Sequence, residues 1–237
     1  MDVRLDSYLA HLGVASRRGI ADALKRKTVT VNDVRILEPG VRVDPAKDRI
    51  LVDGRVLSKP KFLYYLVNKP VGIVSTVMDE KHRKSVRSLV PKPGRIYPVG
   101  RLDKDTSGLI ILTNDGELTN KLTHPRFHVA KTYRLTIKGL LFAEKLEKLR
   151  TGVRLDDGMT LPARVVVKKD TKAETIADMT ITEGRNRQIR RMCEMLRIPL
   201  ISLQRVQFGP IALDKLPEGK YRELSRKEVE ALYASVK

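Results

Sequence analysis

Two carboxylates lie close together in a polar loop over residues 99–107. Asp103 and Asp105 are two residues apart, and an apolar run over 108–113 that predicts a buried strand follows the loop directly. A loop that is fixed at one end by a buried strand can hold its side chains in place. Carboxylates at this spacing suit acid–base chemistry, metal binding or the capping of a turn. From the spacing alone, a polar turn is the commonest explanation.

A second polar segment, residues 183–192, contains four arginines within seven positions: Arg185, Arg187, Arg190 and Arg191. The segment follows an alternating strand pattern and predicts the start of a helix over 186–196. Three of its arginines would occupy neighbouring helix positions. Arginine near a helix N-terminus opposes the helix dipole. These side chains are therefore either solvated or placed to meet anions, for which a buried carboxylate and RNA phosphates are the candidates.

Tyr133 is a third candidate, because it lies in an alternating strand pattern over residues 131–138. A tyrosine on a strand usually belongs to the packed core, and the functional alternative is a single aromatic ring that holds one base. The chain has no Trp and only 5% aromatic residues. Broad base-stacking platforms like those of single-strand binders are therefore not expected.

The composition points to a polyanionic partner. The 237-residue chain has a formal net charge of +19 at pH 7. Each Lys or Arg that meets a phosphate releases a counterion, so a surplus of this size favours nucleic-acid binding. A basic protein without such a role, or a ribosomal structural protein, is the alternative at this level.

The sequence shows no pattern typical of a metal site, a bound cofactor or a membrane segment. The single cysteine, Cys193, allows neither a disulfide framework nor a cysteine zinc cluster, and the four histidines are scattered. No phosphate-binding or dinucleotide-binding glycine motif is present. No apolar run reaches the roughly 18 residues of a membrane helix, and the N-terminus lacks a signal-peptide core. We expect no metal, no cofactor and a cytoplasmic location.

The first 58 residues predict a small unit that binds RNA. Helical spacing over 4–12 is followed by a second helix over 17–27 with Ser16 as N-cap, and by short strands over 28–31 and 49–54. Basic residues gather at both ends of the second helix, which is typical of phosphate contact, although a solvated surface is the alternative. They are Arg17, Arg18, Lys25, Arg26 and Lys27. Residues 58–61 are expected to form a linker.

Residues 59–237 predict a larger α+β domain. Strands are expected over 62–67, 72–76, 108–113, 131–138, 162–168, 175–182 and 200–206, and helices over 115–122, 142–150, 186–196 and 225–235. The last helix begins with Ser225 and has Glu228 three residues later, which is a capping-box pattern. Many alternating strands with few helices favour a mixed, mainly antiparallel sheet.

Several segments together resemble the RsuA-type bacterial ribosomal-RNA pseudouridine synthases. The N-terminal run from Arg4 through Val14-Ala15-Ser16-Arg17-Arg18 to Val31-Asn32 resembles the RNA-binding alpha-L motif known from ribosomal protein S-four. The other segments are Asn68-Lys69-Pro70-x-Gly72, Gly100-Arg101-Leu102-Asp103 with Asp105-Thr106-x-Gly108-Leu109, Lys131-x-Tyr133, Gly184-Arg185-x-Arg187-Gln188-Ile189-Arg190-Arg191-Met192 and Leu203-x-Arg205-x-x-x-Gly209 with Leu213, Leu216, Gly219 and Arg222. The resemblance covers nearly the whole chain.

The resemblance implies roles for individual residues. Asp103 would be the essential catalytic aspartate, and Arg190 would pair with it. Tyr133 would stack on the target base and assist in proton removal. The other substrate contacts would come from Arg101 beside the flipped nucleotide, from Ile189 and Leu203 in the pocket wall, and from Arg187. Asp105 is expected to hold the loop.

The implied reaction turns a uridine of ribosomal RNA into pseudouridine. It breaks the bond from the uracil nitrogen to the ribose and rejoins the ring through carbon, so no redox cofactor is required. The uridine must first leave its stack, at a cost of a few kcal/mol. The segment 184–188 is more similar to the branch that acts on large-subunit (23S) RNA than to the small-subunit (16S) branch, which is the alternative. The implied enzyme is a monomer whose partner is ribosomal RNA or a subunit precursor.

Two other functions compete with this one. A non-catalytic RNA-binding factor in ribosome assembly explains the charge and the N-terminal unit, but it does not explain Asp103, Tyr133 and Arg190. Convergence of those three residues in one cleft favours the enzyme. A metal-dependent nuclease using Asp103, Asp105 and Asp115 is disfavoured, because arginine beside the carboxylates suits a metal ion poorly.

Overall fold

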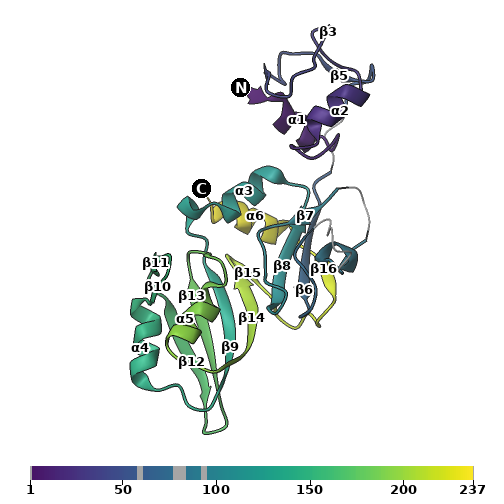
Figure 1. The fold of residues 1–237 in the computed structure, drawn as a ribbon. Helices are drawn as coiled ribbons and strands as arrows, with labels where there is room; N and C mark the ends of the chain where they lie inside the picture. The colour runs from purple at the N-terminus through teal and green to yellow at the C-terminus, as the bar shows by residue number, and fades with distance from the viewer. Residues whose placement is uncertain (1, 58–60, 77–83, 92–94, 237) are drawn as a thin grey trace. The chain divides into compact units, whose positions relative to one another are not determined.

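The computed structural model describes residues 2–57, 61–76, 84–91 and 95–236. The chain divides into two compact units (Figure 1). The first consists of Met1–Phe62 with Pro93–Arg95, and the second consists of Leu63–Lys92 with Ile96–Lys237. Residues 58–60 of the expected linker lie outside the described residues.

The first unit packs two short helices against short antiparallel strands. Its elements are β1 (Val3–Arg4), α1 (Leu5–His11), α2 (Ile20–Arg26), β2 (Val29–Val31), β3 (Val34–Arg35), β4 (Arg42–Val43) and β5 (Ile50–Val52). Strands β3, β2 and β5 form one sheet, and β1 pairs with β4. Leu5 and Leu9 of α1 meet Ile20 and Leu24 of α2 in a core that the strand valines complete. Helical spacing of these apolar residues gives each helix one buried face.

The second helix begins later than its sequence pattern predicts, and Ser16 is not its N-cap. Gly19 occupies the N-cap position, and the helix starts at Ile20. The Oγ atom of Ser16 accepts a hydrogen bond from the backbone N–H of Gly19 at 2.9 Å. Ser16 therefore stabilises the turn before the helix, as short hydroxyl side chains often do in turns.

The second unit is built on a mixed, mainly antiparallel sheet of nine strands. The order of its main path is β12 (Arg164–Asp170), β13 (Glu174–Ile181), β9 (Lys131–Lys138), β14 (Leu200–Phe208), β8 (Ser107–Thr113), β6 (Tyr64–Lys69) and β16 (Tyr221–Glu223). Two short strands complete it, because β15 (Ile211–Ala212) pairs with β14 and β7 (Tyr97–Pro98) pairs with β8. All pairs are antiparallel except β14 with β8. The expected fold class is confirmed.

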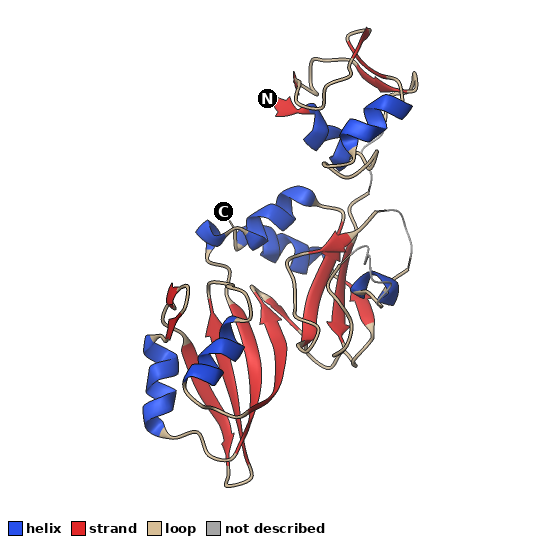
Figure 2. Cartoon of the chain, viewed as in Figure 1, coloured by secondary structure: helices blue, strands red, loops and turns tan. Residues whose placement is uncertain are grey.

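Helices and short segments flank this sheet, as Figure 2 shows. They are η1 (Val86–Leu89), α3 (Gly116–Thr123), η2 (Pro125–Phe127), α4 (Ala143–Thr151), β10 (Arg154–Leu155), β11 (Gly158–Met159), α5 (Gln188–Met195) and α6 (Arg226–Ala234). The predicted capping box is present at the start of α6, where Ser225 and Glu228 bond to each other's backbone N–H. The capping box therefore fixes where the C-terminal helix begins.

The strand expected over 72–76 does not form. Val74 makes one isolated bridge with Ser85. The side chain of Ser75 instead bonds to the backbone of Leu102, donating to its carbonyl at 2.8 Å and accepting from its N–H at 3.0 Å. This segment therefore pairs with the loop that carries Asp103 rather than with a neighbouring strand.

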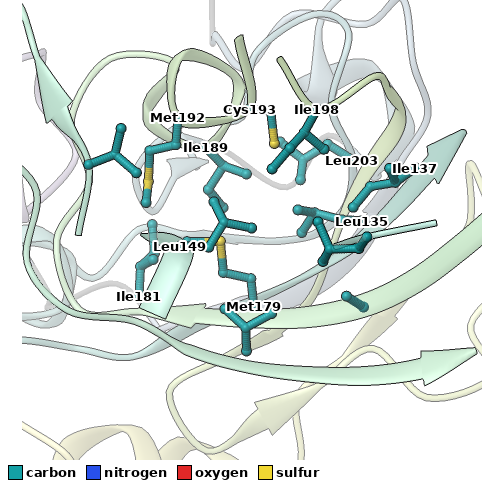
Figure 3. Packing of buried hydrophobic residues seen from close by; sticks show 14 of the residues in the cluster. Leu135, Ile137, Leu149, Met179, Ile181, Ile189, Met192, Cys193, Ile198 and Leu203 are labelled. Carbon is teal, nitrogen blue, oxygen red and sulfur yellow. The ribbon is translucent and has the colours of Figure 1, made fainter. Parts of the chain in front are cut away.

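Helix α5 covers one part of the sheet through an apolar face. Ile189, Met192 and Cys193 pack against strand residues such as Leu135 and Met179 (Figure 3). Burial raises the pKa of the Cys193 thiol to about 12. Because this packing fixes the helix on the sheet, it also fixes the arginines that precede and follow Ile189.

Candidate active site

The Asp103 loop is held at several points. Leu102 is buried and bonds to Ser75, and the backbone N–H of Thr106 donates to the carbonyl of Asp103 at 3.1 Å. Strand β8 begins one residue after Thr106, so the loop ends in a buried strand. The loop is a short turn with a defined shape, which is what a positioned carboxylate requires.

A close approach between β8 and β14 fixes the base of the loop. Gly108 has a φ of +105°, and a Cβ atom built on it would lie 2.6 Å from the backbone nitrogen of Arg205. The side chain of Arg205 crosses the same contact, with Nε donating to the carbonyl of Leu109 at 2.7 Å. Only glycine allows this approach. The glycine of the sequence motif therefore has a packing role.

The loop opens onto a cavity of about 600 Å³. All seven residues that the sequence predicts as catalytic or substrate-binding line it: Arg101, Asp103, Tyr133, Arg187, Ile189, Arg190 and Leu203. They come from the Asp103 loop, from strands β9 and β14, and from the start of α5. Asp103, Tyr133 and Arg190 thus meet in one cleft, although they are far apart in the sequence.

The arginines bind Asp105 rather than Asp103, which corrects the expected pairing of Arg190. Arg187 makes a bidentate ion pair with Asp105 at 3.0 and 3.1 Å, and Nε of Arg190 lies 3.3 Å from the same carboxylate. Nη2 of Arg190 donates to the carbonyl of Asp105 at 2.7 Å. Arg190 therefore binds the Asp103 loop through Asp105. Among the described residues, the ion-pair partner of Asp103 is Arg187, at 4.0 Å.

The geometry of α5 explains this correction. The helix begins at Gln188 rather than near 186, and Arg187 before it adopts a left-handed conformation with a φ of +46°. Arg190 consequently lies in the first helical turn, where it reaches Asp105 and the hydroxyl of Thr106. Asp103 keeps a side chain that is 33% exposed, so its carboxylate is open to a ligand in the cavity.

The two arginines also set the charge state of Asp105. Burial alone would raise the pKa of this carboxyl, but the hydrogen bonds from Arg187 and the charge of Arg190 outweigh burial and lower it. Asp105 is therefore ionised at neutral pH. Its role as the residue that holds the loop agrees with these contacts.

The family model for RNA pseudouridylate synthase matches residues 63–195, and the model for the S4 domain matches residues 3–50. The chain belongs to the RNA pseudouridylate synthase family. As a member, it is an isomerase that forms pseudouridine.

Similar proteins agree over almost the whole length. The chain is 44% identical to the ribosomal large subunit pseudouridine synthase B of Bacillus subtilis, over 98% of this chain and 96% of that protein. It is 34% identical to an uncharacterized RNA pseudouridine synthase of Aquifex aeolicus, over 100% and 96%. A crystal structure of a pseudouridylate synthase, 29% identical, matches 97% of this chain and 99% of that chain with a TM-score of 0.70.

Lys69 is a buried cation near Asp103 and Asp105 of this pseudouridylate synthase, and it was not among the predicted site residues. Its side chain is fully buried, and Nζ donates to the carbonyls of Pro70 and Ile73 at 2.9 Å each. Burial lowers its pKa to about 8, although the charges of Asp105 and Asp103 act in the opposite direction. Lys69 belongs to the quoted Asn68-Lys69-Pro70 motif, which was the signal available in the sequence.

Three cations that line the cavity were not among the predicted site residues, namely Lys131, Arg185 and Arg205. Strand alternation could have identified Lys131, because residues 131 and 133 face the same side of β9. The same alternation places Arg205 on the side of β14 that carries Leu203, and Arg205 also belongs to the Leu203-x-Arg205 motif, so both signals were available in the sequence.

The hairpin of β10 and β11 is bound by two arginines at the start of α5. Arg191 makes a bidentate ion pair with Asp157 at 2.8 and 3.0 Å. Arg185 donates to the carbonyls of Asp157 and Gly158 at 3.1 Å each. Arg185 also lines the cavity. The two arginines therefore hold β10 and β11 in place, and they are not solvated side chains.

The basic residues predicted to bind RNA lie on the surface of the first unit. Arg17 and Arg18 occupy the turn before α2, Lys25 and Arg26 its last turn, and Lys27 its C-cap. All five are exposed. Some have carboxylate neighbours, such as Asp22 at 3.7 Å from Lys25 and Asp53 at 3.1 Å from Lys27. Exposed pairs of this kind exchange readily for phosphate contacts, because they contribute little stability.

Asp115 does not belong to the cavity, which removes the nuclease arrangement. It is buried at the N-terminus of α3, where its carboxylate accepts from the N–H of Leu118 and from the hydroxyls of Tyr64 and Tyr233. No group of three residues suited to hold a metal ion occurs in the described ranges. Within those same ranges, no helix has the length and apolar character to cross a membrane.

Proposed function

We propose that this chain isomerises one uridine of large-subunit (23S) ribosomal RNA to pseudouridine, with Asp103 as the catalytic carboxylate. The observation that carries the proposal is the meeting of Asp103, Tyr133 and the arginines of α5 in one cavity. The choice of the large subunit draws on the printed name of the Bacillus subtilis relative, which is 44% identical.

The chemistry fits a carboxylate with this environment. The uracil must separate from the ribose, turn, and rejoin through carbon, and nothing is oxidised, so the reaction calls for no redox cofactor. An ionised carboxylate can act as a nucleophile or remove a proton in such a rearrangement. Asp103 is partly exposed to the cavity, and its carboxylate lies 4.0 Å from Arg187.

The other residues bind and position the substrate. Tyr133 stacks on the target base, and the apolar side chains of Ile189 and Leu203 enclose it. Arg101 lies exposed at the cavity beside the extruded nucleotide. Arg187 and Arg190 hold Asp105, and through it they keep the turn that presents Asp103. Arg190 is thus a positioning residue.

The N-terminal domain, residues 1–58, supplies binding energy through RNA phosphates, and residues 59–237 form the catalytic domain. Extrusion of a uridine from its stack costs a few kcal/mol. Phosphate contacts remote from the reacting atoms can offset that cost. The chain acts as a monomer on ribosomal RNA or on a subunit precursor.

The direct test is to incubate the purified protein with unmodified 23S and 16S RNA and with ribosomal-subunit precursors, and to map pseudouridine chemically. We expect one modified position in 23S RNA. Modification confined to 16S RNA would contradict the choice of subunit, and no new pseudouridine in any of these RNAs would contradict the activity.

The role of Asp103 has its own prediction. Asp103→Ala should reduce turnover by roughly 10⁴-fold or more, because loss of an essential catalytic group leaves only binding and positioning. The dissociation constant for RNA should stay close to that of the wild type. Asp178→Asn is a matched control, because Asp178 pairs with Arg134 on the outer surface of the sheet and does not line the cavity. Retained turnover in Asp103→Ala would remove Asp103 from its role.

A further inference from the structure

Two cations meet on the floor of the cavity beside Tyr133. Arg205 of β14 is the direct partner of Tyr133 across the sheet, and Lys131 lies two residues before Tyr133 on β9. Both side chains line the cavity. Both also lie near the ring of Phe208, with the guanidinium carbon 5.0 Å and Nζ 6.0 Å from its centroid. The two positive groups therefore share one small region.

Arg205 has more hydrogen-bonding capacity than its surroundings use. The residue is 2% exposed, and its Nε donates to the carbonyl of Leu109. Its Nη2 is buried and has no hydrogen-bond partner. A buried guanidinium donor without a partner is costly, since the group has lost its water. A ligand that brings a hydrogen-bond acceptor into the cavity would satisfy this donor.

Lys131 is a second cation without a carboxylate. Its Nζ donates to the carbonyl of Val129 at 3.0 Å, and no ion pair to it is found in the described part of the chain. Burial, together with the charge of Arg205, lowers the pKa of Lys131 to about 8. An anion between the two groups would act against this lowering of the pKa, because an opposite charge favours the charged form of Lys131.

Of the carboxylates near the cavity, Asp105 and Glu183 are already engaged by other groups, whereas Asp103 is open to the cavity. Asp105 is bound by Arg187 and Arg190. Glu183 accepts hydrogen bonds from Arg185 and from Gln188. The cavity floor thus has a surplus of positive charge that these two acidic residues do not balance. A surplus of this kind favours an anionic ligand.

We propose that Lys131 and Arg205 together bind a backbone phosphate of the target nucleotide. The proposal rests on the proposed function, in which the target base stacks on Tyr133. Residues two apart on a strand are separated by roughly 6–7 Å, and direct cross-strand neighbours by about 5 Å. A phosphate one sugar away from a base on Tyr133 comes within reach of both cations. Arginine with a neighbouring lysine is well suited to bind phosphate oxygens.

The test compares uridine with its monophosphates. We would titrate uridine, uridine 5′-monophosphate and uridine 3′-monophosphate into the full-length protein at fixed ionic strength and measure dissociation constants by calorimetry. At least one monophosphate should bind the wild type roughly tenfold or more tightly than uridine, because charge-assisted hydrogen bonds add to the affinity. The phosphate whose addition tightens binding identifies the side of the nucleotide that is held.

Lys131→Gln assigns the effect to this site. In this variant, the advantage of the monophosphate over uridine should fall to about twofold or less, while uridine binds as it does to the wild type. Lys131→Arg should keep most of the advantage. Lys168→Gln is the matched control, because Lys168 is exposed on β12 and does not line the cavity, and it should behave as the wild type. Thermal unfolding of each variant checks that the fold is intact.

Three results would overturn the proposal. They are equal affinity of the wild type for uridine and both monophosphates, an unchanged ratio in Lys131→Gln, and no measurable binding of either monophosphate at about 10 mM. Because these titrations require no turnover, their outcome is independent of the pseudouridine mapping. Failure of the phosphate site and failure of the proposed reaction can therefore be told apart.

Discussion

Asp103 and Asp105 are two residues apart, yet their surroundings differ. Asp105 is bound by two arginines, whereas Asp103 is open to the cavity and lies at the limit of ion-pair distance from Arg187. A carboxylate saturated with hydrogen bonds is a poor base or nucleophile, because the reaction would have to break those bonds. We therefore expect Asp105 to hold the loop and Asp103 to face the substrate.

A substitution at Asp105 tests this division. Asp105→Asn removes the charge that pairs with Arg187 and Arg190 but leaves the backbone carbonyl to which Arg190 donates. The loop should become less well fixed, so kcat should fall by roughly 10- to 100-fold, because small misplacements of a reacting group are costly. The dissociation constant for RNA should change little. We would measure both quantities with Asp178→Asn as the control.

The two outcomes of that experiment have different meanings. A loss as large as that of Asp103→Ala would make Asp105 a catalytic group in its own right. An unchanged kcat would show that the two arginines do not position Asp103 through Asp105.

At the scale of elements, the parallel contact of β8 and β14 supports the site. Gly108 on β8 lies against the backbone of Arg205 on β14. The contact connects the Asp103 loop to the strand that carries Leu203 and Arg205 into the cavity. β8 and β14 thus position different parts of the site. They can lie this close together because Gly108 has no side chain.

Gly108→Ala should therefore destabilise the second unit strongly. The added methyl group would meet the backbone of Arg205, and the residue would be held at a φ of +105°. The conformational cost is about 1–2 kcal/mol, and overpacking adds roughly 1–3 kcal/mol. The free energy of unfolding, measured with urea, gives the total.

Gly219→Ala separates the two contributions. Gly219 has a φ of +77°, and no atom lies within 4 Å of a Cβ built on it. This variant should lose only the conformational part, about 1–2 kcal/mol. Equal losses in the two variants would mean that the β8–β14 contact relaxes without cost.

At the scale of the whole molecule, the net charge of +19 serves binding rather than folding. Exposed lysines of the first unit such as Lys25 and Lys27 pair with exposed carboxylates, whereas Arg205 of the second unit is buried and lines the cavity. The exposed cations of the first unit are expected to set affinity for RNA in general. The cations of the cavity are expected to act on one nucleotide.

Four substitutions in the first unit test its part in affinity: Arg17→Gln, Arg18→Gln, Lys25→Gln and Arg26→Gln together. The slope of log affinity against log salt concentration should fall by about 0.7 to 0.9 for each phosphate contact that is lost. Filter binding of ribosomal RNA over a range of salt concentrations measures it. The matched control removes four exposed cations of β12 and the turn after it, namely Arg164, Lys168, Lys169 and Lys172. Equal slopes in both variants would mean that the first unit has no special part in binding.

Much of this protein follows from the sequence, for local reasons. The alternation of apolar residues predicts strand β9 with its bounds, and the pair Ser225 and Glu228 predicts where α6 begins. The motifs also contain all seven predicted catalytic and substrate-binding residues, each of which lines the cavity. The strand and the start of the helix depend on near neighbours in the chain, which a sequence pattern records directly, whereas the site residues were found through the resemblance to a known family.

Only the tertiary structure decides which groups meet. Arg190 binds Asp105 and not Asp103, because α5 begins at Gln188 after a left-handed Arg187. Residues 72–76 support the Asp103 loop instead of forming a strand. Lys131 and Arg205 come together through the register of β9 and β14. Each of these facts depends on contacts between segments far apart in the chain, whose geometry is set by packing and not by local sequence.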